Sequence, residues 1–179
     1  MTTSAPRRLV VTAATALIGM LALAGASQGA AETGSFGPSQ GPFTDAVDFT
    51  GTCIGPGAIG TISGIDTVVG HFTENGPPAF GFHDHGTVTS VYRVSFSDGR
   101  YVLGTDVAHF NDNATHNGQM TSTNVVHGSG SLYAADGRPL GSVGVHAMFH
   151  LTFRDANGNH QPDPGEVSSS RDRFMLTCK

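Results

Sequence analysis

The sequence predicts an all-β protein: one antiparallel domain of about eight short strands, closed into a small barrel of lipocalin-like size in preference to a sandwich. Three observations lead to this prediction. Apolar and polar residues alternate at every second position, turn residues recur at short intervals, and the two cysteines lie near the two ends of the domain. No segment shows the periodicity of a convincing helix.

The alternation is clearest in segment 143–153, VGVHAMFHLTF. One face of this predicted strand carries Val143, Val145, Ala147, Phe149, Leu151 and Phe153, and the other carries Gly144, His146, Met148, His150 and Thr152. Segments 43–53 and 87–96 follow the same period. Turn residues separate the predicted strands at Asn75-Gly76, Ser97-Asp98-Gly99, Asn117-Gly118, Gly128-Ser129-Gly130 and Asp136-Gly137.

The cysteine pair favours a barrel over a sandwich. Outside the cell, an even pair such as Cys53 and Cys178 is most simply a disulfide. Both residues share the phase of nearby apolar side chains, so both sulfurs are expected to point inward. A bridge between the first and last strands would fasten the seam of an up-and-down barrel.

Residues 1–31 have the features of a secretory signal peptide. Arg7 and Arg8 precede an apolar run that is shorter than the roughly 20 residues of a membrane-spanning helix, and small residues follow it. The sequence leaves open whether export follows the general or the twin-arginine route. The Gly/Ser/Pro-rich segment 32–42 is expected to be a flexible lead-in, and residues 43–179 form the predicted domain.

Charge and composition exclude some classes of partner. Removal of the leader lowers Lys+Arg from 9 to 7 against 14 Asp+Glu, which gives a net charge of about −7. Such a chain has no electrostatic footprint for nucleic acid, and no segment predicts a stable membrane anchor. The low charge, the high glycine content and the absence of tryptophan resemble uncharacterised small secreted β-barrel proteins of high-GC Gram-positive bacteria.

The segment 155–166, DANGNHQPDPGE, is a candidate calcium loop. Its oxygen ligands would be Asp155, Asn157, Asn159, Asp163 and Glu166, with the backbone carbonyl of Gln161. The segment resembles the D-x-N-x-N-x-x-x-D-x-x-E calcium loops of secreted bacterial proteins. It departs from the EF-hand pattern because His160 stands where that loop has glycine, and because strands flank it. The alternative is a polar hairpin, and the two interpretations are compatible.

All nine histidines lie outside the leader. His83 and His85 share one strand face and could hold a zinc or copper ion with a ligand from a neighbouring strand. His146 and His150 are too far apart along a strand to share one ion. These four are expected to point outward, whereas His109 is in phase with Leu103 and Val107 and is the candidate for an interior polar residue.

The sequence supports more than one function and contains no recognisable nucleophile, phosphate-loop or metalloprotease motif. The leading hypothesis is a secreted binding or interaction module for a small molecule or protein. The alternatives are a barrel enzyme of the allene oxide cyclase or dirigent type, and a histidine-based metal-binding protein. The 14 acidic residues also allow a pair of catalytic carboxylates brought together by the fold.

Overall fold

The structure, a computed structural model, describes residues 31–75, 81–115, 117–154 and 165–179. These residues form seven long β-strands and no helix, so the all-β prediction is confirmed. The strands are β1 (Ala31–Asp48), β2 (Ile59–Asn75), β3 (Gly81–Phe96), β4 (Tyr101–Ala114), β5 (Gln119–Tyr133), β6 (Pro139–Arg154) and β7 (Val167–Cys178). In the described part of the chain, no helix exists that could cross a membrane.

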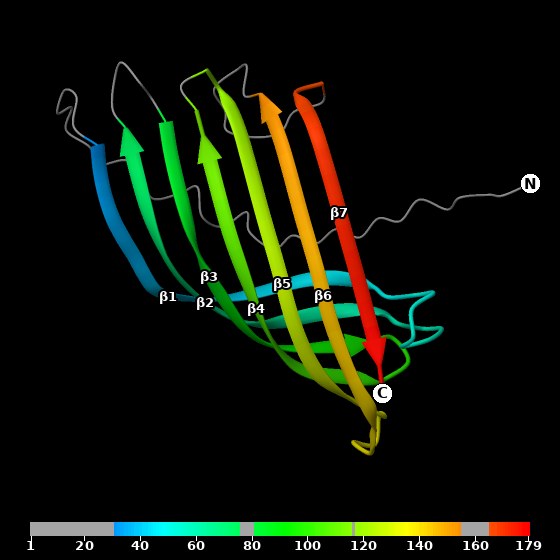
Figure 1. The fold of residues 1–179 in the computed structure, drawn as a ribbon. Coiled ribbons are helices and arrows are strands. Elements are labelled where there is room, and N and C mark those ends of the chain that lie inside the picture. The colour runs from blue at the N-terminus through cyan, green and yellow to red at the C-terminus, as the bar shows by residue number, and fades with distance from the viewer. Residues whose placement is uncertain (1–30, 76–80, 116, 155–164) are drawn as a thin grey trace, which may run out of the picture.

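The strands form one antiparallel sheet in which each strand pairs with its neighbours in the sequence, in the order β1 to β7. β1 and β4 bend sharply partway along their length, and their lower parts turn toward the lower end of β7 (Figure 1). The predicted closed barrel is not supported, because the described strands β1 and β7 share no backbone pairing. The sheet is coiled, and its two outer edges stay separate.

The described chain has seven strands where about eight were expected, because Gly128-Ser129-Gly130 is not a turn. Both glycines lie inside β5, opposite Asp106 and Gly104 of β4. A Cβ added at Gly130 would lie 2.7 Å from the Val102 side chain, so the glycine is required by packing. The turns at Asp98-Gly99, Asn117-Gly118 and Asp136-Gly137 are confirmed.

Residues 32–42, expected to be a flexible lead-in, form more than half of β1 and pair with β2. The pairing uses backbone groups, which glycine and serine supply as well as any other residue. The register shifts between Phe36 and Ser39, which accommodates Gly37 and Pro38.

The sheet has two faces, which we call inner and outer. The inner face carries the core, and its lower part packs Tyr92, Val94, Phe96, Val102 and Val143 against Ile54 and Ala58 of the β1–β2 connection. The outer face carries the alternate residues. The alternation predicted for segment 143–153 is confirmed, since Val143, Ala147 and Phe153 are buried on the inner face.

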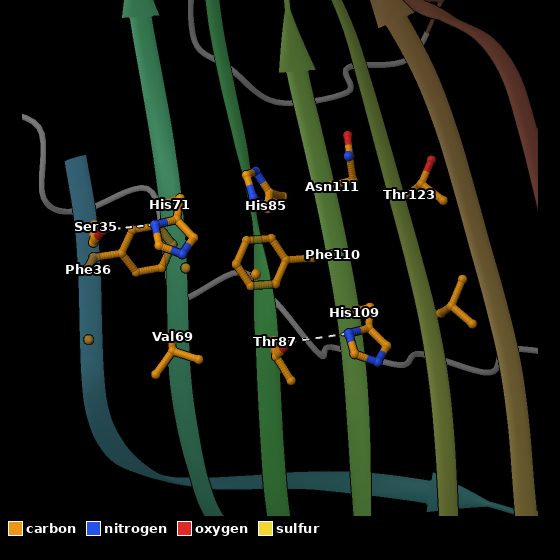
Figure 2. A pocket seen from close by; sticks show the side chains of 14 residues that line it. Ser35, Phe36, Val69, His71, His85, Thr87, His109, Phe110, Asn111 and Thr123 are labelled. Atoms are coloured by element: carbon orange, nitrogen blue, oxygen red, sulfur yellow. Dashed lines mark hydrogen bonds between the residues drawn. The ribbon is translucent and has the colours of Figure 1, made fainter. Parts of the chain in front are cut away.

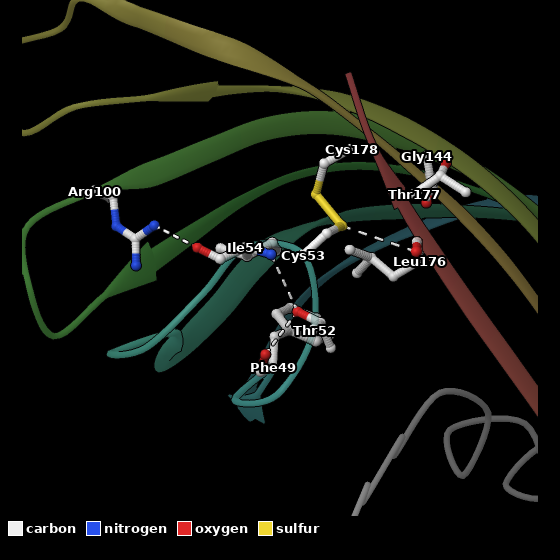
Figure 3. Close-up of a disulfide and its surroundings, with 9 residues drawn as sticks. All are labelled: Phe49, Thr52, Cys53, Ile54, Arg100, Gly144, Leu176, Thr177 and Cys178. Carbon is white, nitrogen blue, oxygen red and sulfur yellow. Dashed lines mark hydrogen bonds between the residues drawn. A yellow bond between two sulfur atoms is a disulfide. The ribbon is translucent and has the colours of Figure 1, made fainter.

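The disulfide between Cys53 and Cys178 is confirmed, with the two Cα atoms 5.9 Å apart. Cys53 lies in the connection after β1 and not in the strand itself, so the bridge joins that connection to the end of β7 (Figure 3). Phe49 stacks on Phe174 of β7 with ring centroids 6.2 Å apart. The disulfide and this ring contact therefore join the two edges of the sheet near the carboxyl ends of β1 and β7.

Candidate functional site

Basic and acidic side chains lie on opposite faces of the sheet. Antiparallel partners directly opposite each other share a face, so the register assigns each residue to one face. Every histidine and arginine within the described strands lies on the outer face: His71, His83, His85, Arg93, His109, His127, His146, His150, Arg154, Arg171 and Arg173. Every acidic residue of these strands except Asp48 lies on the inner face: Glu32, Asp45, Asp66, Glu74, Asp84, Asp106, Asp112 and Asp172.

Three of the outer histidines lie together on β2 and β3. His71 is directly opposite His85, and their ring centroids are 5.5 Å apart. His83 is two residues from His85 on the same strand, with ring centroids 5.3 Å apart. Ser35 of β1 is within 2.8 Å of His71 Nδ1, so a neighbouring strand holds the first of these rings.

Hydroxyl groups orient other histidines in the same way. Thr87 Oγ1 lies 3.2 Å from His109 Nδ1, and Thr123 Oγ1 lies 2.9 Å from His150 Nδ1. Each contact joins adjacent strands. The imidazole rings are therefore held in place by the sheet.

An open hollow crosses this part of the outer face, from β1 to β5. Its lining includes Ser35, His71, His85, Thr87, His109 and Thr123. Figure 2 shows these side chains on successive strands. Its imidazole and hydroxyl groups lie among the apolar side chains of Phe36, Val69, Phe110 and Val125, and no acidic side chain is part of the lining.

A second pair of histidines lies further along the outer face. His127 on β5 is directly opposite His146 on β6. Their ring centroids are 4.6 Å apart and their Nδ1 atoms are 3.2 Å apart. The spacing along one strand related His146 only to His150, whereas its partner His127 lies on the neighbouring strand.

That His83 and His85 hold a metal ion remains a prediction. Within the residues that the structure describes, no three His, Cys, Asp or Glu side chains are arranged to hold a metal ion. Both histidines lie on the outer face, as expected, and His71 is the neighbour that the register adds.

The structure corrects the prediction for His109, which is exposed on the outer face. On β4 the buried residues are Val102 and Phe110, and the odd-numbered positions face outward. Leu103, which set the expected phase, is itself 44% exposed. The prediction took Leu103 as an inward-facing residue, and because Leu103 faces outward, it assigned His109 to the wrong face of the sheet.

The candidate calcium loop falls largely outside the described residues. Asp155, Asn157, Asn159, Gln161 and Asp163 are not described, and Glu166 precedes β7. The backbone N–H of Arg154 donates to the carbonyl oxygen of Glu166. The segment connects β6 to β7, so the flanking strands are as predicted.

The inner face carries a carboxylate pair that the sequence analysis did not identify. Asp84 on β3 lies directly opposite Asp112 on β4. Burial, and to a lesser extent the charge of Asp112, raises the pKa of Asp84 to about 6. Burial also raises the pKa of Asp112, against a hydrogen bond from Ser122 that lowers it.

A second acidic row crosses the inner face nearer the core, from Asp66 through Ser90 to Asp106. Burial and the neighbouring Asp66 raise the pKa of Asp106, while the hydrogen bond from the buried Ser90 lowers it. Burial, together with the charge of Asp106, raises the pKa of Tyr92 to about 12. These carboxylates therefore lie at the border of the core.

Comparisons with known proteins identify no relative: no family model, no curated protein and no solved structure matches the chain. Sequence signals for both missed pairs do exist. His127 and His146 are equally far in sequence from the Asp136-Gly137 turn, and Asp84 and Asp112 are equally far from Asp98. In a hairpin, residues at equal distances from the turn lie opposite each other.

Proposed function

We propose that this chain is a secreted binding module that recognises an anionic partner, such as an acidic protein segment, with the outer face of its sheet. The observation that carries the proposal is the sorting of charge. All strand histidines and arginines of the described chain face outward, and the outer face bears no strand carboxylate except that of Asp48. Complementary charge of this kind guides association and selects partners.

Apolar side chains on the same face support a binding role. Val91 is 62% exposed, and Ile65, directly opposite it on β2, is 54% exposed. Leu103, Met148 and Met175 are further large exposed apolar residues of the outer face. Exposed apolar groups among polar ones are typical of protein interaction surfaces.

Binding should strengthen on acidification. Imidazole side chains as a class gain positive charge in the range of about pH 8 to pH 5, so the outer face becomes more cationic as the pH falls. A pure apolar interface would not show this dependence. The pH response therefore distinguishes the proposed recognition from simple hydrophobic association.

The test is the binding of immobilised poly-L-glutamate and poly-L-lysine, measured by biolayer interferometry at about pH 7.5 and about pH 5.5. We expect poly-L-glutamate to bind, more tightly at the lower pH, and the variant His71→Gln/His85→Gln/His109→Gln to lose most of that gain. The matched control is Ser63→Ala/Ser95→Ala/Ser131→Ala on the same face. Binding of poly-L-lysine alone, or equal binding by the histidine variant, would contradict the proposal.

Secretion and calcium binding are separate parts of the proposal. The leader of residues 1–31 supports export, and the disulfide is consistent with an extracellular location. Amino-terminal sequencing of protein from the culture medium should begin near residue 32. For calcium, the ligand spacing of 155–166 is the support, and a calorimetric titration with no heat and no change in melting temperature would exclude the site.

A second candidate, an enzyme with paired catalytic carboxylates, is supported by the Asp84–Asp112 pair. A half-buried carboxyl whose pKa is raised to about 6 is suited to general acid–base chemistry near neutral pH. Native mass spectrometry of protein from its own host tests this candidate. A retained small molecule that Asp84→Asn and Asp112→Asn both fail to retain would favour it over the binding module.

A further inference from the structure

We infer that His127 and His146 hold a copper ion on the outer face of the sheet. The two residues are directly opposite on β5 and β6, so adjacent strands fix their relative position. This site is separate from the proposed recognition of an anionic partner and does not depend on it.

The distance between the two ring nitrogens supports metal binding. Two nitrogen ligands at about 2.0 to 2.1 Å from one ion are roughly 2.9 to 3.4 Å apart, from a square-planar to a tetrahedral arrangement. The Nδ1 atoms of His127 and His146 are 3.2 Å apart. The spacing of the two nitrogens therefore matches that of two ligands on one ion, and the exposed rings turn from their hydrogen-bonded orientation to direct both lone pairs at it.

In the metal-free pair, one Nδ1 donates a hydrogen bond and the other accepts it. Copper takes the place of that proton. The donor ring loses its proton at Nδ1 to solvent and takes one up at Nε2, so both neutral rings present a lone pair to the ion and the net charge of the pair is unchanged.

The surrounding side chains favour copper over harder ions. Met175 on β7 is directly opposite His146, and Met148 lies two residues along β6 on the same face. Both are exposed, at 42% and 36%, and Met175 Sδ accepts an N–H of Arg173 at 3.5 Å. Imidazole binds copper as well as zinc, thioether sulfur favours copper in its Cu⁺ state, and no strand carboxylate shares this row to attract Ca²⁺ or Mg²⁺.

Two protein nitrogens leave the remaining coordination positions to water. This agrees with the finding that no group of three His, Cys, Asp or Glu ligands occurs among the described residues. An ion held this way is exposed and exchangeable. The chemistry fits capture or delivery of copper better than a structural role.

The experiment uses the full chain, purified without a histidine tag, with Cu²⁺ and Zn²⁺ salts as probes in isothermal titration calorimetry. We expect one Cu²⁺ to bind more tightly than Zn²⁺, as the order of divalent-metal affinities predicts. His127→Asn and His146→Asn should each weaken Cu²⁺ binding by at least about tenfold. Electron paramagnetic resonance of the Cu²⁺ complex should show two coupled nitrogens in the natural protein and fewer in either variant.

The matched controls are His109→Asn and His150→Asn, which remove outer-face histidines from neighbouring rows. Both should retain the natural affinity and the two-nitrogen spectrum. The inference is overturned if these controls lose copper as much as the pair variants do, if Zn²⁺ binds as tightly as Cu²⁺, or if His127→Asn and His146→Asn bind as the natural protein does. Unchanged circular dichroism of each variant establishes that the fold is intact.

Discussion

Asp84 and Asp112 face each other across β3 and β4, and in each residue Oδ1 is buried without a hydrogen-bond partner within the described structure. Like charges directly opposite on adjacent strands destabilise a sheet. The pKa of Asp84 is raised from 3.8 to about 6, so the folded state favours the protonated carboxyl. The pair is a local cost to folding at neutral pH.

The first prediction is that Asp84→Asn stabilises the protein above about pH 6. A raised carboxyl pKa means that the folded state binds more protons than the unfolded state between about pH 4 and about pH 6. The stability contributed by Asp84 is present below that window and is lost as the pH rises through it. Because the side chain is partly exposed, we expect a gain of only about 1 kcal/mol at neutral pH.

Urea denaturation of both proteins, at intervals from about pH 4 to about pH 8, measures this gain. The difference in free energy of unfolding should be near zero at the acidic end and reach its full size above the pKa of Asp84. Asp172→Asn, an exposed inner-face carboxyl on β7, is the control and should show no such rise. A constant difference across the pH range would mean that ionisation of the partly buried Asp84 carboxyl is not the cause.

A second prediction concerns the packing of Tyr92 on Gly104, which lies directly opposite it on β4. A Cβ added at Gly104 would lie 2.7 Å from the Tyr92 ring, and Tyr92 is only 8% exposed. We expect Gly104→Ala to lower the free energy of unfolding by roughly 2 kcal/mol, because the buried ring has to move. Chemical denaturation measures the loss.

The control for this prediction is Gly41→Ala. Gly41 also lies on the inner face, and a Cβ there would meet no atom within 4 Å. We expect little change, or a small gain from the reduced freedom of the unfolded chain. Equal losses at both glycines would show that glycine is needed for its backbone and not for the space above it.

The sequence predicts those features of the sheet that depend on local spacing, but not those that depend on the register between strands. The alternation in 143–153 depends only on local spacing, and it placed His146 and His150 on the outer face correctly. The pairs Asp84–Asp112 and His127–His146 depend on register, and a shift of one residue moves a whole strand to the opposite face. The register of two neighbouring strands could be predicted from the sequence only where the turn between them was identified correctly.

Two failures have a physical origin in the same sheet. Gly128 and Gly130 have the composition of a turn, but they provide space within a strand, so composition alone divided β5 in two. The closed barrel was inferred from the disulfide. Cys53 lies beyond the end of β1, and a side-chain bridge there brings the ends of the sheet together without backbone pairing of β1 and β7.

A third prediction concerns Arg100, which holds the β1–β2 connection against the β3–β4 turn. Its guanidinium donates to the carbonyl oxygens of Ile54 at 2.6 Å and Pro56 at 2.8 Å. Ile54 is part of the core, so these contacts keep an apolar side chain in place. We expect Arg100→Gln to cost roughly 2 kcal/mol of stability, the range of hydrogen bonds from a charged donor.

Asp98 separates this effect from a simple ion pair. Its carboxylate lies 2.7 Å from Arg100, and Arg100 lowers the pKa of Asp98. Asp98→Asn keeps an oxygen that can accept the backbone N–H of Arg100, so it should cost less than Arg100→Gln. An equal or larger loss in thermal melts of Asp98→Asn would assign the stabilisation to the ion pair.

The last prediction concerns the disulfide, which spans a sequence separation of 125 residues. In the chain-entropy model, a loop of this length stabilises the folded state by roughly 4 to 5 kcal/mol. Cys53→Ser/Cys178→Ser should therefore lower the melting temperature strongly, because the described β1 and β7 share no backbone pairing that could replace the bridge. Reductant should destabilise the natural protein to the level of the variant and leave the variant unchanged. A variant as stable as the natural protein would mean that Phe49 on Phe174 and the surrounding core already hold the lower end of the sheet together.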